Sequence, residues 1–377
     1  MVHRILAVVG ARPNFVKMAP LLHALQASEA VEVSLAHTGQ HYDQAMSDAF
    51  LDQLALPQPD HFLGVGSGTH GEQTAAVLVG IERILQRERP GMVIVAGDVN
   101  STLGAGLAAA KQRVLLTHLE AGLRSGDWSM PEEVNRVVTD RVSDLLLCHS
   151  PSAVDNLLAE GISRDRIALV GNTMIDSLFA LLDSARAAGA VERLGLSPRG
   201  YVLVTLHRPA LVDDPGKLAD VLRVLDEVAV DLPVVFPTHP RTRARLEDEA
   251  ELVGRVRLVE PLDYLDFLGL EADARLVVTD SGGVQEETSA LGVPCLTYRT
   301  STERPITVEL GTNRLVGVDP VALRTACLEA LDAPEPTESP SIPLWDGYAG
   351  GRAADSILAG LEAQRAEPET SVALDPE

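Results

Sequence analysis

One pattern of apolar and polar positions repeats along the chain as far as about residue 331: a short apolar run, a polar stretch, and then a helical pattern. Continuous apolar runs are typical of parallel strands that are buried on both faces. In the first half they cover residues 5–9, 31–36, 92–96, 114–119, 145–148 and 167–170. Helical patterns lie between them, at residues 18–26, 72–86 and 104–111. The alternation predicts a doubly wound α/β sheet.

A second series of the same kind begins near residue 201. Its apolar runs cover residues 201–205, 234–237, 256–258, 276–279 and 295–298, with helical patterns at 218–228 and 284–291. Glycine and proline in residues 191–200 favour a crossover between the two series. We therefore predict two Rossmann-like domains, residues 1–171 and 172–347, with a hinge within residues 171–200.

The composition changes after Leu331 to the Pro- and Ser-rich string APEPTESPSIP, which predicts a loop. Residues 353–365 return to a helical pattern, and residues 366–377 read as a frayed acidic tail.

The charge of the chain is strongly negative, with 54 Asp and Glu against 31 Lys and Arg and a net charge of −23. A surface of this sign repels nucleic acid and anionic membranes. We therefore expect neither as a partner.

Cysteine usage and metal-binding patterns exclude several classes of protein. The 3 cysteines lie far apart without a CxxC pair, which argues against a disulfide scaffold and a thiolate zinc site. His37 and His41 have a metal-like spacing but occupy a predicted loop, and no HExxH or comparable motif occurs. We therefore expect no metal site. The N-terminal apolar run lacks a cleavage site and predicts a first strand, so we expect a cytoplasmic protein.

Polar strings follow several of the predicted strands, where open α/β sheets bind their ligands. They are GARPNFVK at 10–17, GDVNS at 97–101, HLEAGLRS at 118–125 with PEEVNR at 131–136, TLHRP at 205–209, DSGGVQEE at 280–287 and TERP at 302–305. GSGTHG at 66–71 matches GxGxxG, but no convincing strand precedes it, so a dinucleotide site is not supported. If the two domains face each other, the strand ends would line a cleft between them.

Three acidic residues in these strings suit general acid and base chemistry, provided that their surroundings differ. Asp98 could instead cap a helix, and Glu132 could simply place charge in a first helical turn. Glu120 lies at the end of a predicted strand, where neither helix capping nor first-turn charge explains it. His207, beside an arginine, is as consistent with a structural as with a catalytic role.

Two of the strings have features that suit a phosphate group. Ser281, Gly282 and Gly283 would let backbone N–H groups at a helix start approach an anion. Arg12 and Lys17 supply cations after the first strand, where Gly10 permits a tight turn. Arg304 supplies a further cation, and Glu287 lies one turn into its helix, on the face that could reach a ribose diol.

Taken together, the strings resemble the non-hydrolysing UDP-N-acetylglucosamine 2-epimerases. GARPNFVKMAPL, HTGQHYD, GDVNSTL, HLEAGLRS, MPEEVNR, TLHRP, DSGGVQEE and STERP occur in family order with family-like spacing, from Ile5 to about Gly347. The resemblance implies a glycosyltransferase-B-like fold with an interdomain active site. It also implies a homodimer, a UDP-sugar substrate and no cofactor, and a C-terminal helix that packs back on the first domain.

The resemblance implies inversion at C2 of the sugar, which gives UDP-N-acetylmannosamine. UDP is eliminated to leave 2-acetamidoglucal and is then added back with a proton on the opposite face. The matching residues imply the site: catalytic Asp98, Glu120, Glu132 and His207; phosphate-binding Arg12, Lys17, Ser281, Gly282, Gly283 and Arg304; Glu287 for ribose; Phe267 near uracil; and Arg136 among the substrate contacts. Which carboxylate removes the proton and which returns it stays open.

Two departures from the family pattern bear on specificity and regulation. Leu211 stands where the family usually has Asn. Gln40 and His239 match parts of a family site for an activating second UDP-N-acetylglucosamine, but Glu72 replaces an expected arginine there. Allosteric activation is therefore a hypothesis that activity on UDP-N-acetylmannosamine alone would test.

Three alternatives to the reversible epimerase stay open. A hydrolysing 2-epimerase would release N-acetylmannosamine and UDP. A glycosyltransferase of the same fold would need one base and an acceptor groove, which the pair Glu120 and Glu132 argues against. A non-catalytic sugar-nucleotide sensor would tolerate loss of the carboxylates, yet all three are present.

Overall fold

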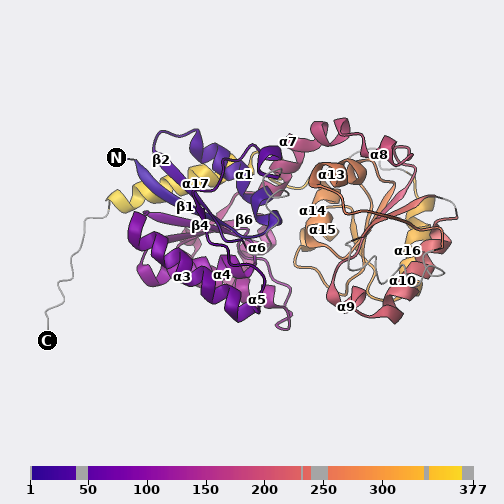
Figure 1. Ribbon diagram of the computed structural model, residues 1–377, viewed down its shortest axis with the longest axis horizontal. Helices are drawn as coiled ribbons and strands as arrows, with labels where there is room; N and C mark the ends of the chain where they lie inside the picture. The colour runs from indigo at the N-terminus through magenta and orange to yellow at the C-terminus, as the bar shows by residue number, and fades with distance from the viewer. Residues whose placement is uncertain (1, 40–49, 231, 239–253, 335–338, 367–377) are drawn as a thin grey trace. The chain divides into compact units, whose positions relative to one another are not determined.

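The computed structural model describes residues 2–39, 50–230, 232–238, 254–334 and 339–366 (Figure 1). The chain forms two compact units. Unit 1 comprises Met1–Gly122, Trp128–Thr173 and Tyr348–Glu377, and unit 2 comprises Leu123–Asp127 and Met174–Gly347. Helix α7, Thr173–Ala187, begins where the chain passes from unit 1 to unit 2.

Unit 1 contains a sheet in the order β3-β2-β1-β4-β5-β6-β7, and every neighbouring pair is parallel. Its strands are β1 His3–Val9, β2 Val31–His37, β3 His61–Phe62, β4 Met92–Ala96, β5 Leu115–Leu119, β6 Leu145–Cys148 and β7 Ile167–Leu169. The strand order reverses direction between β1 and β4, and ligands of doubly wound sheets bind at such a point. Because Ala96 pairs with Leu119, the chain leaves β4 and β5 side by side at Gly97 and Glu120.

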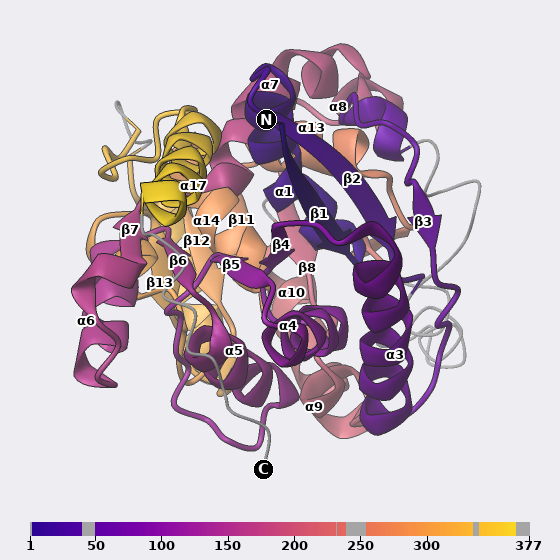
Figure 2. The same cartoon turned by 90° about the vertical axis from the view of Figure 1, so that its left-hand side faces the viewer.

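The helices of unit 1 bury their apolar faces against this sheet. They are α1 Arg12–Gln26, α3 His70–Glu88, α4 Asn100–Gln112, α5 Pro131–Val142, α6 Pro151–Ala159 and α17 Ala349–Ala366, with a 3-10 turn at Arg164–Arg166. Figure 2 shows α3, α4 and α5 side by side. Helix α17 packs closely on α1, since a Cβ added to Gly350 would lie 2.6 Å from the backbone of Pro20.

Unit 2 repeats the arrangement with a sheet in the order β10-β9-β8-β11-β12-β13, again parallel throughout. Its strands are β8 Val202–Thr205, β9 Val234–Pro237, β10 Arg257–Val259, β11 Leu276–Thr279, β12 Cys295–Thr297 and β13 Asn313–Leu315. The order reverses between β8 and β11. Thr205 pairs with Thr279, so the segments that follow, toward His207 and Asp280, start at neighbouring positions.

The helices of unit 2 enclose a core of apolar side chains from both faces of the sheet. Besides most of α7, they are α8 Ala190–Arg193, α9 Pro209–Val212, α10 Pro215–Val228, α13 Tyr264–Ala272, α14 Gly282–Leu291, α15 Pro305–Glu309 and α16 Pro320–Asp332. No helix among the described residues has both the length and the apolar character that a bilayer-spanning helix needs.

The predicted pair of doubly wound α/β sheets is confirmed, and every apolar run named above overlaps an observed strand. Strands β3 and β13 were not predicted, because β3 has only 2 residues and β13, Asn-Arg-Leu, begins with two polar residues, so neither forms a continuous apolar run. Helix α1 begins at Arg12 rather than at residue 18, with a proline in its first turn. Arg12 to Lys17 are thus helical residues rather than part of a loop.

Candidate active site

The turn between β1 and α1 lies against the start of α4. A Cβ added to Gly10 would lie 2.2 Å from Oγ of Ser101, whose hydroxyl is 2.7 Å from Oγ1 of Thr38. The backbone of Gly10 does not enter the left-handed region. Glycine is therefore needed here for the close approach of Ser101, and the tight turn that the sequence suggested is not the reason.

Asn14, for which the sequence predicted no role, ties this turn to β4. Its Oδ1 accepts hydrogen bonds from the backbone N–H groups of Gly10 and Ala11, at 3.3 and 3.0 Å. Its Nδ2 donates to the carbonyl of Ala96 at 2.8 Å. Because the side chain is buried, these bonds hold the ends of β1 and β4 together.

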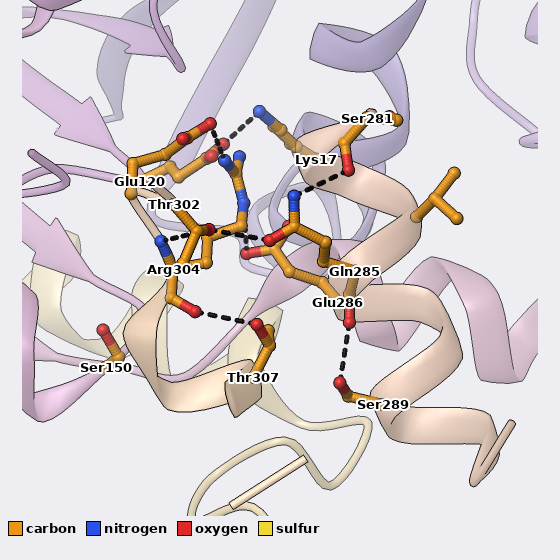
Figure 3. A network of polar contacts seen from close by, with 12 residues as sticks. Lys17, Glu120, Ser150, Ser281, Gln285, Glu286, Ser289, Thr302, Arg304 and Thr307 are labelled. Atoms are coloured by element: carbon orange, nitrogen blue, oxygen red, sulfur yellow. Dashed lines mark hydrogen bonds and ion pairs between the residues drawn. The ribbon is translucent and has the colours of Figure 1, made fainter. Parts of the chain in front are cut away.

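Lys17 and Glu120 form a buried ion pair beside the carboxyl ends of strands β4 and β5 (Figure 3). The exposed fraction of each residue is 8%. A Cβ added to Gly97 would lie 3.2 Å from Nζ of Lys17 and 3.7 Å from Oε2 of Glu120, so both groups lie beside the Gly97 turn. The backbone of Glu120 has φ of +69°, a strained conformation for a side-chain-bearing residue and one that is concentrated at functional sites.

Asp98 directly follows Gly97 in the chain and is held by α5. Its carboxylate pairs with Arg136, which also contacts Glu133 at 3.1 Å, and its carbonyl accepts from Nδ2 of Asn135 at 2.8 Å. The N-cap of α4 is Val99, without a side-chain cap, so the capping role considered for Asp98 is excluded. Glu132 is half-buried in the first turn of α5.

Several predicted residues of the first half have no described side chain. Arg12 is the first residue of α1, and its side chain falls outside the described part. Gln40 and His41, and His239 of unit 2, also lie outside the described residues.

His37 is stacked between Phe15 and Phe62, at ring-centroid distances of 5.2 and 5.3 Å, and its burial lowers its pKa. Among the described residues, no group of three or more His, Cys, Asp or Glu side chains could hold a metal ion.

The point of strand reversal in unit 2 is organised by Asp280. Its carboxylate accepts hydrogen bonds from the backbone N–H groups of His207 and Arg208, at 3.1 and 2.9 Å, and lies 3.1 Å from Nδ1 of His207. Burial by itself would raise the pKa of Asp280, but the hydrogen bonds and charge from His207 and the two backbone N–H groups hold it below its ordinary value. The imidazole of His207 remains 62% exposed, and so available to a ligand.

Helix α14 begins directly after Asp280, with Ser281 as its N-cap and Gly282 and Gly283 as its first residues. The first N–H groups of such a helix have no intrahelical acceptors and favour anions. Gln285, fully buried, donates from Nε2 to the carbonyl of Ser281 at 2.9 Å, and its Oε1 accepts from Thr302 at 2.7 Å (Figure 3). One side chain thus joins two of the predicted phosphate-binding strings.

Arg304 lies against the start of α14, since a Cβ added to Gly282 would be 2.4 Å from its Nη1. Arg304 is 4% exposed, and its guanidinium pairs with Glu286 at 3.0 Å and with Glu303 at 2.5 Å. Glu303 also pairs with Arg299 at 2.7 Å. The charges of this cluster balance, so the helix N-terminus rather than a surplus of cations favours a phosphate here.

Glu287, in α14, is buried and accepts a hydrogen bond from the hydroxyl of Tyr264 at 2.8 Å. Burial raises the pKa of Glu287 to about 7, although the Tyr264 hydrogen bond acts in the opposite direction. Burial and the charge of Glu287 also raise the pKa of Glu271, which is fully buried beside it. Phe267, on the same helix as Tyr264, is half-buried against the core of unit 2.

The structure gives the two departures from the family pattern local explanations. Leu211 is buried in the main apolar cluster of unit 2, where an amide would need hydrogen-bond partners. Glu72 completes a capping box at the start of α3, with Oε2 accepting from the backbone N–H of Thr69 at 2.9 Å.

A sequence model of the UDP-N-acetylglucosamine 2-epimerase family matches residues 23–358 of this chain. The chain belongs to this family. A Methanocaldococcus jannaschii protein named UDP-N-acetylglucosamine 2-epimerase is 42% identical over 320 residues, which are 82% of this chain and 87% of that protein.

A second relative and a solved structure are also similar to this chain. A Pseudomonas aeruginosa protein named UDP-2,3-diacetamido-2,3-dideoxy-D-glucuronate 2-epimerase is 43% identical over 318 residues, covering 83% of this chain and 88% of that protein. The crystal structure of the Methanocaldococcus jannaschii epimerase in complex with UDP-GlcNAc and UDP superposes with a TM-score of 0.86 at 39% identity, covering 95% of this chain and 100% of that one.

Proposed function

We propose that this protein reversibly converts UDP-N-acetylglucosamine to UDP-N-acetylmannosamine, without net hydrolysis. Membership of the 2-epimerase family supports inversion at C2. The observation that carries the proposal is the pair of acidic side chains, Asp98 and Glu120, held by buried cations where β4 and β5 end. An enzyme that both removes and returns a proton at one carbon needs two such groups.

The proposed reaction proceeds by elimination and re-addition. One carboxylate of unit 1 takes the C2 proton while the bond between C1 and the UDP oxygen breaks, which leaves 2-acetamidoglucal. A second acidic group then delivers a proton to the opposite face as UDP adds back. Lys17 beside Glu120, and Arg136 beside Asp98, would keep both acids oriented during these transfers. Glu132, at the start of α5, is the third candidate.

Unit 2 would bind the UDP part of the substrate. The N–H groups of Gly282 and Gly283 would contact phosphate oxygens. Arg304, whose guanidinium lies against Gly282, would hold this first turn of α14 in place. His207 is exposed and anchored through Asp280, so it would stabilise charge on the departing diphosphate. Glu287 would accept hydrogen bonds from the ribose hydroxyls.

Proton NMR of the reaction products tests this proposal. The purified protein, incubated with UDP-N-acetylglucosamine, is expected to yield a mixture that contains UDP-linked N-acetylmannosamine. Free N-acetylmannosamine with stoichiometric UDP would instead support a hydrolysing enzyme. An unchanged substrate would contradict the proposal.

A second candidate substrate follows from the comparison with the Pseudomonas aeruginosa relative. That protein is as similar to this chain as the Methanocaldococcus jannaschii epimerase, yet its name specifies a diacetamido uronate sugar. The same C2 chemistry would serve either sugar. Comparing kcat/KM for the two UDP-sugars decides between them, and we expect the higher value for UDP-N-acetylglucosamine.

The compartment and the oligomeric state stay proposals. We infer a cytoplasmic protein because the cysteines Cys148, Cys295 and Cys327 are all buried and unbridged, as suits a reducing compartment. The homodimer implied by the resemblance would be measured by light scattering on the purified chain.

The binding of UDP-sugars is expected to depend on pH through Glu287. The carboxylate accepts hydrogen bonds from a ribose diol better than the neutral acid does, and the pKa of Glu287 is raised to about 7 by burial. Since a pH below this value protonates the group, affinity should rise by about tenfold between pH 6 and pH 8. Glu287→Gln should flatten this dependence. Calorimetry with UDP-glucose suits the test because its diphosphate does not titrate in this range, and a slope that survives in the variant would contradict the assignment.

A further inference from the structure

Two buried polar side chains in unit 1 have no part in the site described above. His118 lies on β5 and Asp140 on α5, and both residues are 0% exposed. The contact between Nδ1 of His118 and Oδ1 of Asp140 is 2.6 Å long. Burying such groups is costly unless every polar atom has a partner, so the partners of this pair indicate what it does.

The second nitrogen of His118 contacts the peptide next to Asp98. Nε2 lies 2.8 Å from the carbonyl oxygen of Gly97. A carbonyl oxygen can only accept, so Nε2 carries a proton and donates it. Because the carbonyl of Gly97 and the N–H of Asp98 belong to one planar peptide, this bond sets the direction in which the chain enters Asp98.

The second oxygen of Asp140 contacts the turn that follows Glu120. Oδ2 accepts a hydrogen bond from the backbone N–H of Gly122 at 3.1 Å. Gly122 has φ of +84°, and an added Cβ would lie 2.3 Å from the carbonyl oxygen of Ala153, so only glycine fits this turn. Glu120 itself has φ of +69°, a strained conformation that persists only where its surroundings enforce it.

One proton lies between His118 and Asp140. With Nε2 donating to Gly97, a neutral imidazole would direct the lone pair of Nδ1 at a carboxylate 2.6 Å away, which is repulsive. The pair is therefore either imidazolium with carboxylate or imidazole with carboxylic acid. In both forms it is neutral overall and makes all three contacts, which suits a fully buried position.

We propose that His118 and Asp140 are positioning residues that orient the Gly97–Asp98 peptide and the turn after Glu120, and so align the two acidic side chains of unit 1. The catalytic meaning of this alignment rests on the proposed epimerase function. Other bonds in the region complete the frame: Gly97 N–H donates to the carbonyl of Leu119 at 3.0 Å, and the N–H groups of Glu120 and Ala121 donate to the carbonyl of Leu147 at 3.0 and 3.1 Å.

Two substitutions at Asp140 separate positioning from bulk stability. Asp140→Ala removes both contacts, and we expect kcat to fall about 10²-fold, the cost of a small misplacement of catalytic groups, while the affinity for UDP changes by less than about threefold. Asp140→Asn can donate to Nδ1 of a neutral His118 and accept from Gly122, so it should retain kcat within about tenfold of wild type.

A matched control lies at the other end of the same strand. Asp144 is another acid that accepts a backbone N–H, that of Leu116 at 2.8 Å, but it does so at the amino end of β5, away from the acidic side chains. Asp144→Ala should lower thermal stability and leave kcat unchanged. Loss of kcat in Asp144→Ala equal to that in Asp140→Ala would show that destabilisation, and not positioning, is responsible.

Hydrogen–deuterium exchange provides a readout that does not depend on activity. In Asp140→Ala, the amides of peptides covering residues 97–100 and 120–123 should exchange faster than in wild type, and in Asp144→Ala they should not. If Asp140→Ala does not fold, two variants of His118 replace it. His118→Gln places an amide near the position of Nε2 and should keep exchange in the peptide covering residues 97–100 slow, whereas His118→Asn reaches only Asp140 and should not.

The two sets of results separate the two proposals. A wild-type protein without epimerase activity would overturn the proposed function, and the exchange comparison would still decide the positioning role. Unchanged exchange at both peptides in folded Asp140→Ala, or Asp140→Asn as impaired as Asp140→Ala, would overturn the positioning role.

Discussion

Glu120→Gln is expected to lower kcat by about 10²–10⁴-fold, the range usual for loss of a positioned acid or base. The amide has the shape of the carboxylate and can still accept a hydrogen bond from Lys17, so the neighbouring chain should keep its place. UDP would be bound by unit 2, and its dissociation constant should change by less than about threefold. Initial rates at saturating UDP-N-acetylglucosamine and calorimetry with UDP measure the two quantities.

The control for this substitution is Asp144→Asn. Asp144 accepts a hydrogen bond at the amino end of β5, whereas Glu120 follows the carboxyl end of this strand. Asp144→Asn should keep kcat within about twofold of wild type. Unchanged turnover in Glu120→Gln would remove Glu120 from the reaction. A parallel loss of UDP affinity would indicate that Glu120 holds Lys17 for nucleotide binding and does not act on the sugar.

Arg304→Gln is expected to cause the largest loss of stability. The guanidinium lies between the buried carboxylates of Glu286 and Glu303, and its removal leaves both without this cation. Removing one partner of a buried ion pair costs about 3–5 kcal/mol. The free energy of unfolding of unit 2, measured by urea titration, should fall by this amount, and UDP affinity should fall with it.

The matched control is Arg314→Gln, which breaks an exposed pair with Glu329 at 2.6 Å in the same unit. Both side chains are more than half exposed, so the free energy of unfolding should change by less than about 1 kcal/mol. Equal losses in the two variants would mean that the Arg304 cluster contributes no more to the free energy of unfolding than an ordinary surface ion pair.

The sequence predicted the two sheets because their strands are buried on both faces and therefore form continuous apolar runs. Short edge strands such as β3 and β13 have no such run and were missed. The positions of Asp98, Glu120 and Ser281 at strand or helix ends also followed from the sequence, since each lies in a polar string that follows an apolar run, and Arg304 lies in a further polar string a few residues beyond one.

The partners of these residues could not be predicted. Lys17 read as a phosphate ligand, yet in the structure it pairs with Glu120, which lies far away in the sequence. His118 read as part of a strand and Asp140 had no predicted role, because only the fold brings them within 2.6 Å of each other. Asp280 had a visible place in DSGGVQEE, but its bonds to His207 depend on the order of the strands. Pairings between distant segments are set by topology, and a single sequence carries no local sign of them.

The reaction in deuterated water tests the central claim most directly. Elimination removes the C2 proton and re-addition takes a proton from a group that exchanges with solvent. UDP-N-acetylmannosamine formed from UDP-N-acetylglucosamine should therefore carry deuterium at C2, and mass spectrometry should find its mass increased by about one unit. UDP-N-acetylmannosamine that retains the original C2 proton would contradict the elimination mechanism and the assignment of Asp98 and Glu120 as its acid and base.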